Sequence, residues 1–396
     1  MIKKRILFSA LLISVSALIH AFDFGGSLGT YTKLGTPAVP GDDEFKNYSL
    51  KQEEILTGWF RHDFDSSMFI ASEVDVRFRT TASNLEKTDD IENVVIPDVK
   101  LLRISKKIGS ASNTILVNAG RFYFADISGT IFSQPSDGLN VLLSSRRVNA
   151  KVYANYTGLL NAQNITILNK KDSSYALDTK KGWYFAAPYT NAGLSVDFPY
   201  LFANQTLSAE VLASFGTPGI EDGTSGYNRL WGTLGLNGFI LKNLCYVFTT
   251  TFGTELEDGV SNLTKLSFTY LPKFKSMTVS VFGHYASGEQ FGLKPFKGFT
   301  KSTVCSSAVE PEYSGIVKTG ANISIKPVKS ILAGLNGSAV FSCPKDDFEY
   351  KGFEAGISGN FQIFSDLNIN GSFTQFAAKE KNDSKATFTL SATLAF

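Results

Sequence analysis

Charged side chains at every second position are the part of this sequence that could do chemistry. Two acids and two bases alternate with apolar residues in the order Glu73, Val74, Asp75, Val76, Arg77, Phe78 and Arg79. Successive side chains of a β-strand point to opposite faces, so the four charges share one face and the apolar residues share the other. Such charges either pair with one another and keep that face wet and rigid, or bind and orient a charged solute. Both interpretations stay open on the sequence alone.

The same alternation recurs in other segments, without a pattern typical of catalysis. We expect further side chains to share the polar face in the same way: Lys151, Asp197, Glu210, Lys265, His284, Lys318 and Glu354. The sequence contains no HExxH, GxSxG or CxxC motif and no glycine-rich phosphate loop. Only His62 and His284 follow the amino-terminal segment, so a histidine-based metal cluster is not expected. We therefore predict no catalytic residue, no metal site and no cofactor.

Extended segments of roughly ten residues position these side chains. In the clearest of them, apolar or small residues alternate with polar ones, at 148–157, 206–215 and 317–326. An amphipathic helix would need apolar residues at spacings of three and four, which these segments lack. The contents of 15 Tyr, 33 Phe, 34 Gly and 3 Met also favour β structure. The sequence therefore indicates an all-β chain.

Short and long connections between these segments follow each other in strict alternation. Eight short turns fall near 62–66, 108–112, 144–147, 199–204, 241–243, 272–276, 326–330 and 364–366, and nine longer polar stretches separate them. Short turns on one side and long loops on the other are typical of outer-membrane barrels. We predict one up-and-down antiparallel transmembrane β-barrel over residues 22–396, with about 18 strands, or 16 if one hairpin is miscounted. A secreted β-sandwich or β-helix is the competing fold, but no interdomain linker and no internal repeat supports it.

The two ends of the chain indicate export and insertion into a membrane. Three basic residues at 3–5 precede an uncharged apolar stretch at 6–19, and Ala21 offers a small residue for cleavage. The apolar stretch is shorter than the about 20 residues that a membrane-spanning helix needs. Residues 1–21 are therefore predicted to be a signal peptide. At the other end, apolar and polar residues alternate up to the terminal Phe396. This end resembles the closing strand of bacterial outer-membrane β-barrels, which implies an outer-membrane location and contact with the barrel assembly machinery.

A second resemblance concerns one strand–loop–strand segment. Gly120-Arg121-Phe122 is followed by Gln134-Pro135-Ser136-Asp137-Gly138-Leu139. The segment resembles the Gly-Arg … Asp-Gly-hydrophobic pattern of alginate-export-type and related substrate-specific porins, which have 18 strands. In that family an Arg at the first position can face the pore, which makes Arg121 a candidate pore residue. Its parity matches that of the apolar Val117 and Ala119, so a bulge would be needed to turn it inward. Alternatively, Gly120 eases a bend and Asp137-Gly138 forms a turn before a strand.

Three cysteines, Cys245, Cys305 and Cys343, follow the predicted signal peptide. An odd number allows at most one internal bridge. Cys305 and Cys343 fall in or beside expected outer loops, whereas Cys245 begins a strand at the opposite end. A bridge, if one forms, is therefore expected between Cys305 and Cys343. Three unpaired thiols are the alternative.

The charge balance excludes one class of partner. The chain has 38 Lys+Arg and 36 Asp+Glu, and removal of the three basic residues of the signal peptide leaves 35 against 36, a net charge of −1. No basic patch or stripe stands out, so we expect no nucleic-acid partner.

The function that the sequence favours is a porin-like channel. A barrel of this size leaves an aqueous lumen, so the expected partners are outer-membrane lipid and small hydrophilic solutes. The longest loops, 161–188 and 286–314, are the candidates for narrowing that lumen. The main alternative is a barrel that anchors adhesive or binding loops at the cell surface. An enzyme is not expected, and a transporter of apolar substrates would usually need an amino-terminal plug. The oligomeric state stays open.

Overall fold

The structure is a computed structural model, and it describes residues 23–37, 48–82, 91–110, 112–165, 167–168, 181–217, 227–255, 259–272, 276–300, 314–345, 347–380 and 383–396. The predicted signal peptide at 1–21 lies outside the described residues and stays a prediction. In the described part of the chain, no helix is long and apolar enough to cross a membrane.

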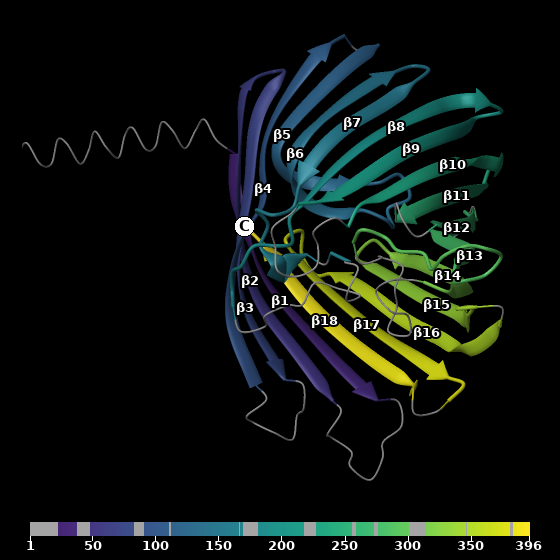
Figure 1. Ribbon diagram of the computed structural model, residues 1–396. Helices are drawn as coiled ribbons and strands as arrows, with labels where there is room; N and C mark the ends of the chain where they lie inside the picture. Colours follow the sequence, from purple (N-terminus) through teal and green to yellow (C-terminus); the bar gives the residue numbers. More distant parts are fainter. Residues whose placement is uncertain are drawn as a thin grey trace, which may run out of the picture.

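Eighteen strands form one sheet that closes on itself, because β1 pairs with β18 as well as with β2 (Figure 1). The strands are β1 (Asp23–Pro37), β2 (Ser49–Asp65), β3 (Met68–Ala82), β4 (Ile91–Gly109), β5 (Asn113–Ala125), β6 (Ser133–Ser145), β7 (Asn149–Tyr156), β8 (Tyr189–Phe202), β9 (Gln205–Gly216), β10 (Arg229–Leu241), β11 (Leu244–Glu255), β12 (Gly259–Tyr270), β13 (Met277–Ala286), β14 (Ile316–Val328), β15 (Ile331–Ser342), β16 (Glu349–Gln362), β17 (Leu367–Ala378) and β18 (Lys385–Ala395). A single turn of 3-10 helix, η2 (Ala162–Asn164), follows β7. Neighbouring strands are antiparallel and adjacent in sequence, so the predicted up-and-down barrel is confirmed with 18 strands, not 16.

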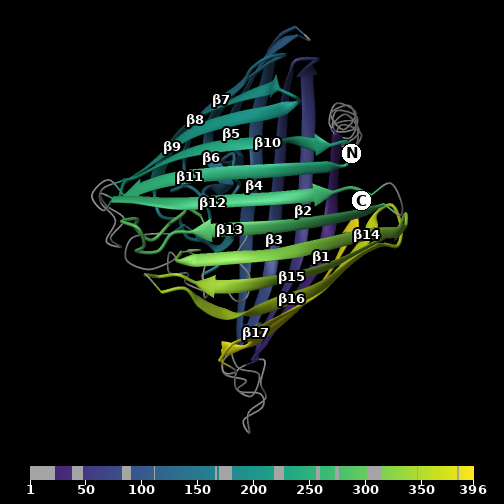
Figure 2. The ribbon, with the colours of Figure 1, turned by 90° about the vertical axis from the view of Figure 1, so that its right-hand side faces the viewer.

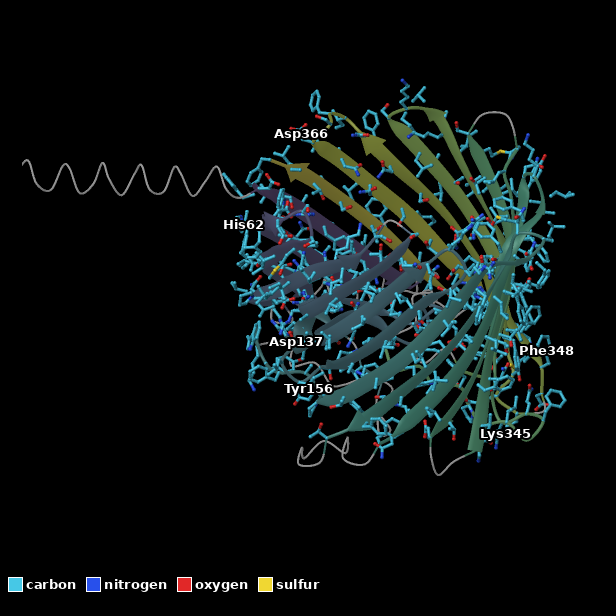
Figure 3. The ribbon with its side chains drawn as sticks, turned by 90° about the horizontal axis from the view of Figure 1, so that it is seen from above. His62, Asp137, Tyr156, Lys345, Phe348 and Asp366 are labelled. Carbon is cyan, nitrogen blue, oxygen red and sulfur yellow. The ribbon has the colours of Figure 1, made fainter. Side chains whose placement is uncertain are left out.

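The two ends of the barrel differ in the same way as the predicted turns and loops. The start of β1 and the carboxyl terminus meet at the turn end, where the backbone N–H groups of Gly26 and Phe396 each donate to the other residue's carbonyl at 2.9 Å. Figure 3 shows His62 and Asp366 at this end and Lys345 and Phe348 at the other. Figure 2 shows the near and far strands crossing at a steep angle, as the tilt of strands in a closed barrel requires.

The strands of the barrel carry exposed apolar residues on their outer face and buried charged residues on their inner face, the reverse of a soluble protein. Leu56, Val76 and Ile357 are about half exposed, at 53%, 47% and 55%. By contrast, Asp75 is 2% exposed and Glu210 is 3% exposed. A closed sheet with an apolar outer face satisfies its backbone groups internally, which is the requirement for crossing a lipid bilayer with strands.

Candidate functional site in the barrel lumen

The connection between β5 and β6 folds into the barrel, where basic side chains of the wall hold it. We call residues 126–132 the inner loop; in Figure 1 it lies inside the ring of strands. Lys265 on β12 donates from Nζ to the Ser128 carbonyl at 2.6 Å and also bonds the Thr130 hydroxyl. Lys151 on β7 donates to the carbonyl of Ala125, directly before the loop, at 2.8 Å. Two of the side chains expected on the polar face therefore bind the inner loop or the residue directly before it.

Glu210 on β9 is the acidic contact of the same loop. Its carboxylate accepts the Ile127 backbone N–H at 2.6 Å and the Tyr153 hydroxyl at 3.1 Å. Lys151 Nζ lies 3.9 Å from it, at the edge of an ion pair. The loop itself is rigid because the Asp126 carboxylate accepts the N–H groups of Ile131 and Phe132 at 3.0 and 2.9 Å. Together these contacts fix the inner loop against the wall formed by β7 to β12.

Segments of two further loops meet the inner loop inside the barrel. In the β13–β14 loop, the Phe299 N–H donates to the Ile131 carbonyl at 2.8 Å. In the β7–β8 loop, the Leu168 N–H donates to the Phe299 carbonyl at 2.9 Å. Both 161–188 and 286–314 were predicted as candidates to narrow the lumen, and their described parts do lie against each other. The inward course of the β5–β6 connection was not predicted.

Arg229, the first residue of β10, joins two of these loops. It is 2% exposed, and its Nη1 donates to the Leu168 and Gly298 carbonyls at 2.8 and 3.0 Å. Its guanidinium also lies within 4.5–5.5 Å of the centres of four aromatic rings, those of Tyr189, Tyr227, Trp231 and Phe299. The Tyr227 hydroxyl donates to the Glu255 carboxylate, and burial raises the pKa of this phenol. Aromatic rings around a cation replace part of its lost hydration.

A charged wall lies on β2 to β4. Arg77 Nε donates to Asp75 at 2.8 Å, and Arg79 Nε donates to Glu53 on β2 at 2.6 Å. Arg79 Nη1 reaches the Gln163 side chain of the β7–β8 loop at 2.8 Å. Between these side chains the apolar residues of β3 point the other way, and Val74, Val76 and Phe78 are each 47% exposed. The acids and bases of β3 thus share one face and pair locally.

A β-bulge adds a cation to this wall. The register between β3 and β4 shifts between the pairs Glu73–Leu101 and Val74–Val99, which leaves Lys100 as the extra residue. Its Nζ lies 3.1 Å from Asp75 and 3.6 Å from Glu73. Sequence reasoning missed Lys100, and the only sign of it is the break in alternation along β4.

The remaining predicted side chains lie on other strands. Lys318 and Glu354 form an ion pair at 3.2 Å with side chains 10% and 3% exposed. His284 is the register partner of Lys265 on one side and of Lys318 on the other, so a row of three basic residues crosses β12 to β14. Asp197 on β8 is half-buried and lies far from this row in the strand order, opposite Ser208 on β9.

Arg121 lies in the seam between β4 and β5. It donates to Asp137 through Nε at 2.9 Å and Nη2 at 2.8 Å. It also donates to the carbonyls of Val99, at 3.2 Å, and Leu159, at 2.9 Å. Asp137 is paired with Tyr156 in the sheet, and Figure 3 labels both. These contacts occupy the guanidinium within the wall, and a role in the pore stays a prediction.

The cysteines give no described bridge. Cys343 is 1% exposed and forms no bridge with another described cysteine, and burial raises its pKa. Cys245 likewise forms no such bridge and is half-buried. Cys305 lies outside the described residues, so a Cys305–Cys343 bridge stays a prediction. In the described ranges, no group of three or more His, Cys, Asp or Glu side chains is placed to hold a metal ion.

Among known proteins, solved structures with a similar fold were found. A scan against family models and a search of curated proteins each gave no match. OccAB4 of Acinetobacter baumannii superposes with a TM-score of 0.61 at 11% identity, covering 94% of this chain and 98% of that one. OccK7 (OpdD) of Pseudomonas aeruginosa gives 0.58 at 9% identity, with 95% and 98% covered. The outer membrane protein OpdK of P. aeruginosa gives 0.55 at 9%, with 94% and 99% covered.

The chain has an outer-membrane porin fold. The predicted resemblance to such porins is thereby confirmed at the level of the fold, over nearly the whole length of both chains. Within this fold the inner loop and the two loops that meet it lie inside the barrel, and the inner loop is bound to the wall of β7 to β12. The charged wall faces them from β2 to β4.

Proposed function

We propose that this chain is an outer-membrane channel through which small hydrophilic solutes diffuse. The observation that carries the proposal is the charged inner face of β2 to β4. Arg77, Arg79 and Lys100 lie beside Glu53 and Asp75 there, inside a closed ring whose outer face is apolar. In the core of a protein, replacing such ion pairs by well-packed apolar residues leaves stability unchanged or increases it, so stability alone does not explain these pairs. A wall of charges instead suits a water-filled path.

The proposed path passes the predicted side chains in two groups. The acids and bases of β3 would act on a passing ion directly. Although they pair locally, their charges still produce an electrostatic potential that varies along the lumen. Lys151, Glu210 and Lys265 would act indirectly, by holding the inner loop. The oligomeric state stays open.

Membrane insertion belongs to the same proposal. Export would remove residues 1–21 by cleavage near Ala21, and the barrel assembly machinery would insert the chain through its closing strand. Outer-membrane lipid would then cover the apolar face. A barrel that serves only as an anchor for adhesive loops is not favoured, because it gives no reason for three loops to meet inside.

Planar-bilayer recording tests the proposal. The purified barrel should add discrete, uniform current steps in KCl, and a sample unfolded by boiling should add none. Steps that scale with the bulk conductivity of several salts would indicate a water-filled path. A barrel that inserts, as shown by its resistance to protease in vesicles, but gives no steps would contradict the proposal.

A further inference from the structure

The wall of the barrel is incomplete between β4 and β5. In the described part of the chain these two strands pair only from Leu102 and Arg121 to Gly109 and Thr114. The rest of β4, from Ile91 to Leu101, pairs with β3 alone. Pro97 lies in this stretch, and a proline without an N–H fits a strand edge that has no partner strand.

The gap arises because the β5–β6 tip leaves the wall. Gly120 and Gly138 are register partners at the point of departure. Gly120 has φ +114°, and a Cβ on either glycine would lie within about 2 Å of a neighbouring carbonyl oxygen, at 2.1 Å for Gly120 and 2.2 Å for Gly138. Beyond Asp137 the pairing of β6 with β7 also stops. The tip is therefore free to turn inward and carry the inner loop to Lys265.

An extension of the β7–β8 hairpin occupies the gap. We call residues 157–162 with 182–189 the wall hairpin. Its two arms form a ladder in which Ala186 N–H donates to Leu160 O at 3.0 Å and Ala162 N–H to Tyr184 O at 2.9 Å. Its Asn161 side chain donates to the Pro97 carbonyl of β4 at 3.1 Å.

Two further contacts join the wall hairpin to the unpaired edge of β4. Gly182 packs so closely on Val95 that a Cβ would lie 1.8 Å from its carbonyl oxygen. Arg121 bridges the Val99 and Leu159 carbonyls. Carbonyl groups at every second position of the β4 edge, at 95, 97 and 99, are thus covered by the hairpin or by Arg121.

The wall hairpin has two faces of different surroundings. Leu160 and Ala186 are 3% and 5% exposed and belong to the apolar cluster inside the barrel, against which Tyr184 also packs. The intervening residues point away from that cluster: Leu159, Trp183 and Phe185 are 52%, 40% and 59% exposed. Along 183–186 this alternation is the one that the barrel strands themselves show, whereas Asn161, Ala162 and Ala187 are buried as well.

We propose that the wall hairpin completes the barrel wall and that Leu159, Trp183 and Phe185 contact outer-leaflet lipid. The inference rests on the membrane location in the proposed function. The outer face of β4 is apolar at Ile104 and at Val95, which is 55% exposed, and further exposed apolar residues lie beyond both, at Ile108 and Ile91. Ten residues of a strand tilted by about 40° rise about 25 Å, the height of the apolar band of such barrels. Trp183 beside Val95 then lies at the outer edge of that band, where aromatic rings anchor barrels.

Trp183 allows a direct test by fluorescence. The protein has three tryptophans, so Trp59→Phe with Trp231→Phe leaves Trp183 as the reporter. The barrel is reconstituted in phosphatidylcholine vesicles with or without brominated acyl chains, which quench only rings that touch them. We expect brominated lipid to reduce Trp183 emission about twofold, as for an interfacial ring on the lipid face.

Two matched variants interpret the result. Trp59→Phe with Trp183→Phe leaves Trp231, which is 2% exposed inside the barrel and should not respond to brominated lipid. Val76→Trp in a protein with all three tryptophans replaced by Phe puts a reporter on the outer face of β3 and should respond. If Val76→Trp responds but Trp183 is quenched only by aqueous iodide, the hairpin faces water and the inference is wrong. If neither responds, the membrane location is wrong as well. Absence of ion conductance with a quenched Trp183 would count against the channel alone.

Discussion

Replacing Lys265 by Met is expected to loosen the inner loop while leaving the barrel intact. The ammonium group makes two hydrogen bonds to the loop, to Ser128 and Thr130. Each charged hydrogen bond contributes about 1.5–3 kcal/mol, and relief of the desolvation of a partly buried ammonium offsets part of this. A net loss of about 2 kcal/mol would raise the population of a detached loop roughly 30-fold. The strand pairing of β12 does not depend on this side chain.

Single-channel recording measures that population as excursions from the main conductance level. We expect Lys265→Met to show excursions far more often than the unmodified protein, with the same heat-modifiable band on electrophoresis. Lys33→Met is the matched control, because Lys33 on β1 is exposed and loses the same charge without touching the inner loop. Equal behaviour of the two variants, or quiet traces from Lys265→Met, would refute the role of Lys265 as a loop anchor.

Three further predictions concern charge, buried pairing and the thiols. Arg77→Glu with Arg79→Glu should move the reversal potential in a KCl gradient towards cation preference without loss of assembly; an unchanged potential would place the residues away from the narrowest part. Lys318→Met should lower the temperature of barrel unfolding, because it removes the ammonium partner of the buried Glu354 carboxylate at a cost of about 3–5 kcal/mol, and adding Glu354→Gln should recover part of this loss. With the other two cysteines replaced by Ser, Cys343 should resist maleimide at pH 7 until the barrel unfolds, since it is buried and its raised pKa keeps it a thiol. Fast labelling of the folded protein would contradict the position found for Cys343.

The strand count was predictable because it depends only on local patterns. A turn of a few residues and a long polar loop differ in length and composition, and each can be recognised without knowing its spatial neighbours. The face shared by Glu73 and Asp75 was predictable for a similar reason, since β3 keeps its alternation unbroken. In β4 one additional residue, Lys100, reverses the faces of all that follow it. Such a bulge breaks the alternation, but the break alone does not show which residue is the extra one.

The contacts that build the site were not predictable because they join distant parts of the chain. Lys265 and Ser128 lie 137 residues apart, and nothing around either residue indicates the other. Two glycines mark the point where the β5–β6 tip turns inward, but Gly120 is equally consistent with an ordinary bend. For Arg229 a local sign did exist. Arg229 is an even number of residues from Thr233 and an odd number from Leu230, so alternation along β10 places it on the inner face with Thr233.

A common face therefore does not imply a common role. On β3, Asp75 and Arg77 pair with each other, but both charged groups remain on the wall of the barrel. On β9 and β12, Glu210 and Lys265 also point inward, but they bind backbone groups of the inner loop. Their charged groups therefore hold the loop in place. If this division is correct, substitutions on β3 should change which ions pass, and substitutions on β9 or β12 should change how steadily they pass. Ion preference and gating noise, measured on the same variants, would then vary independently.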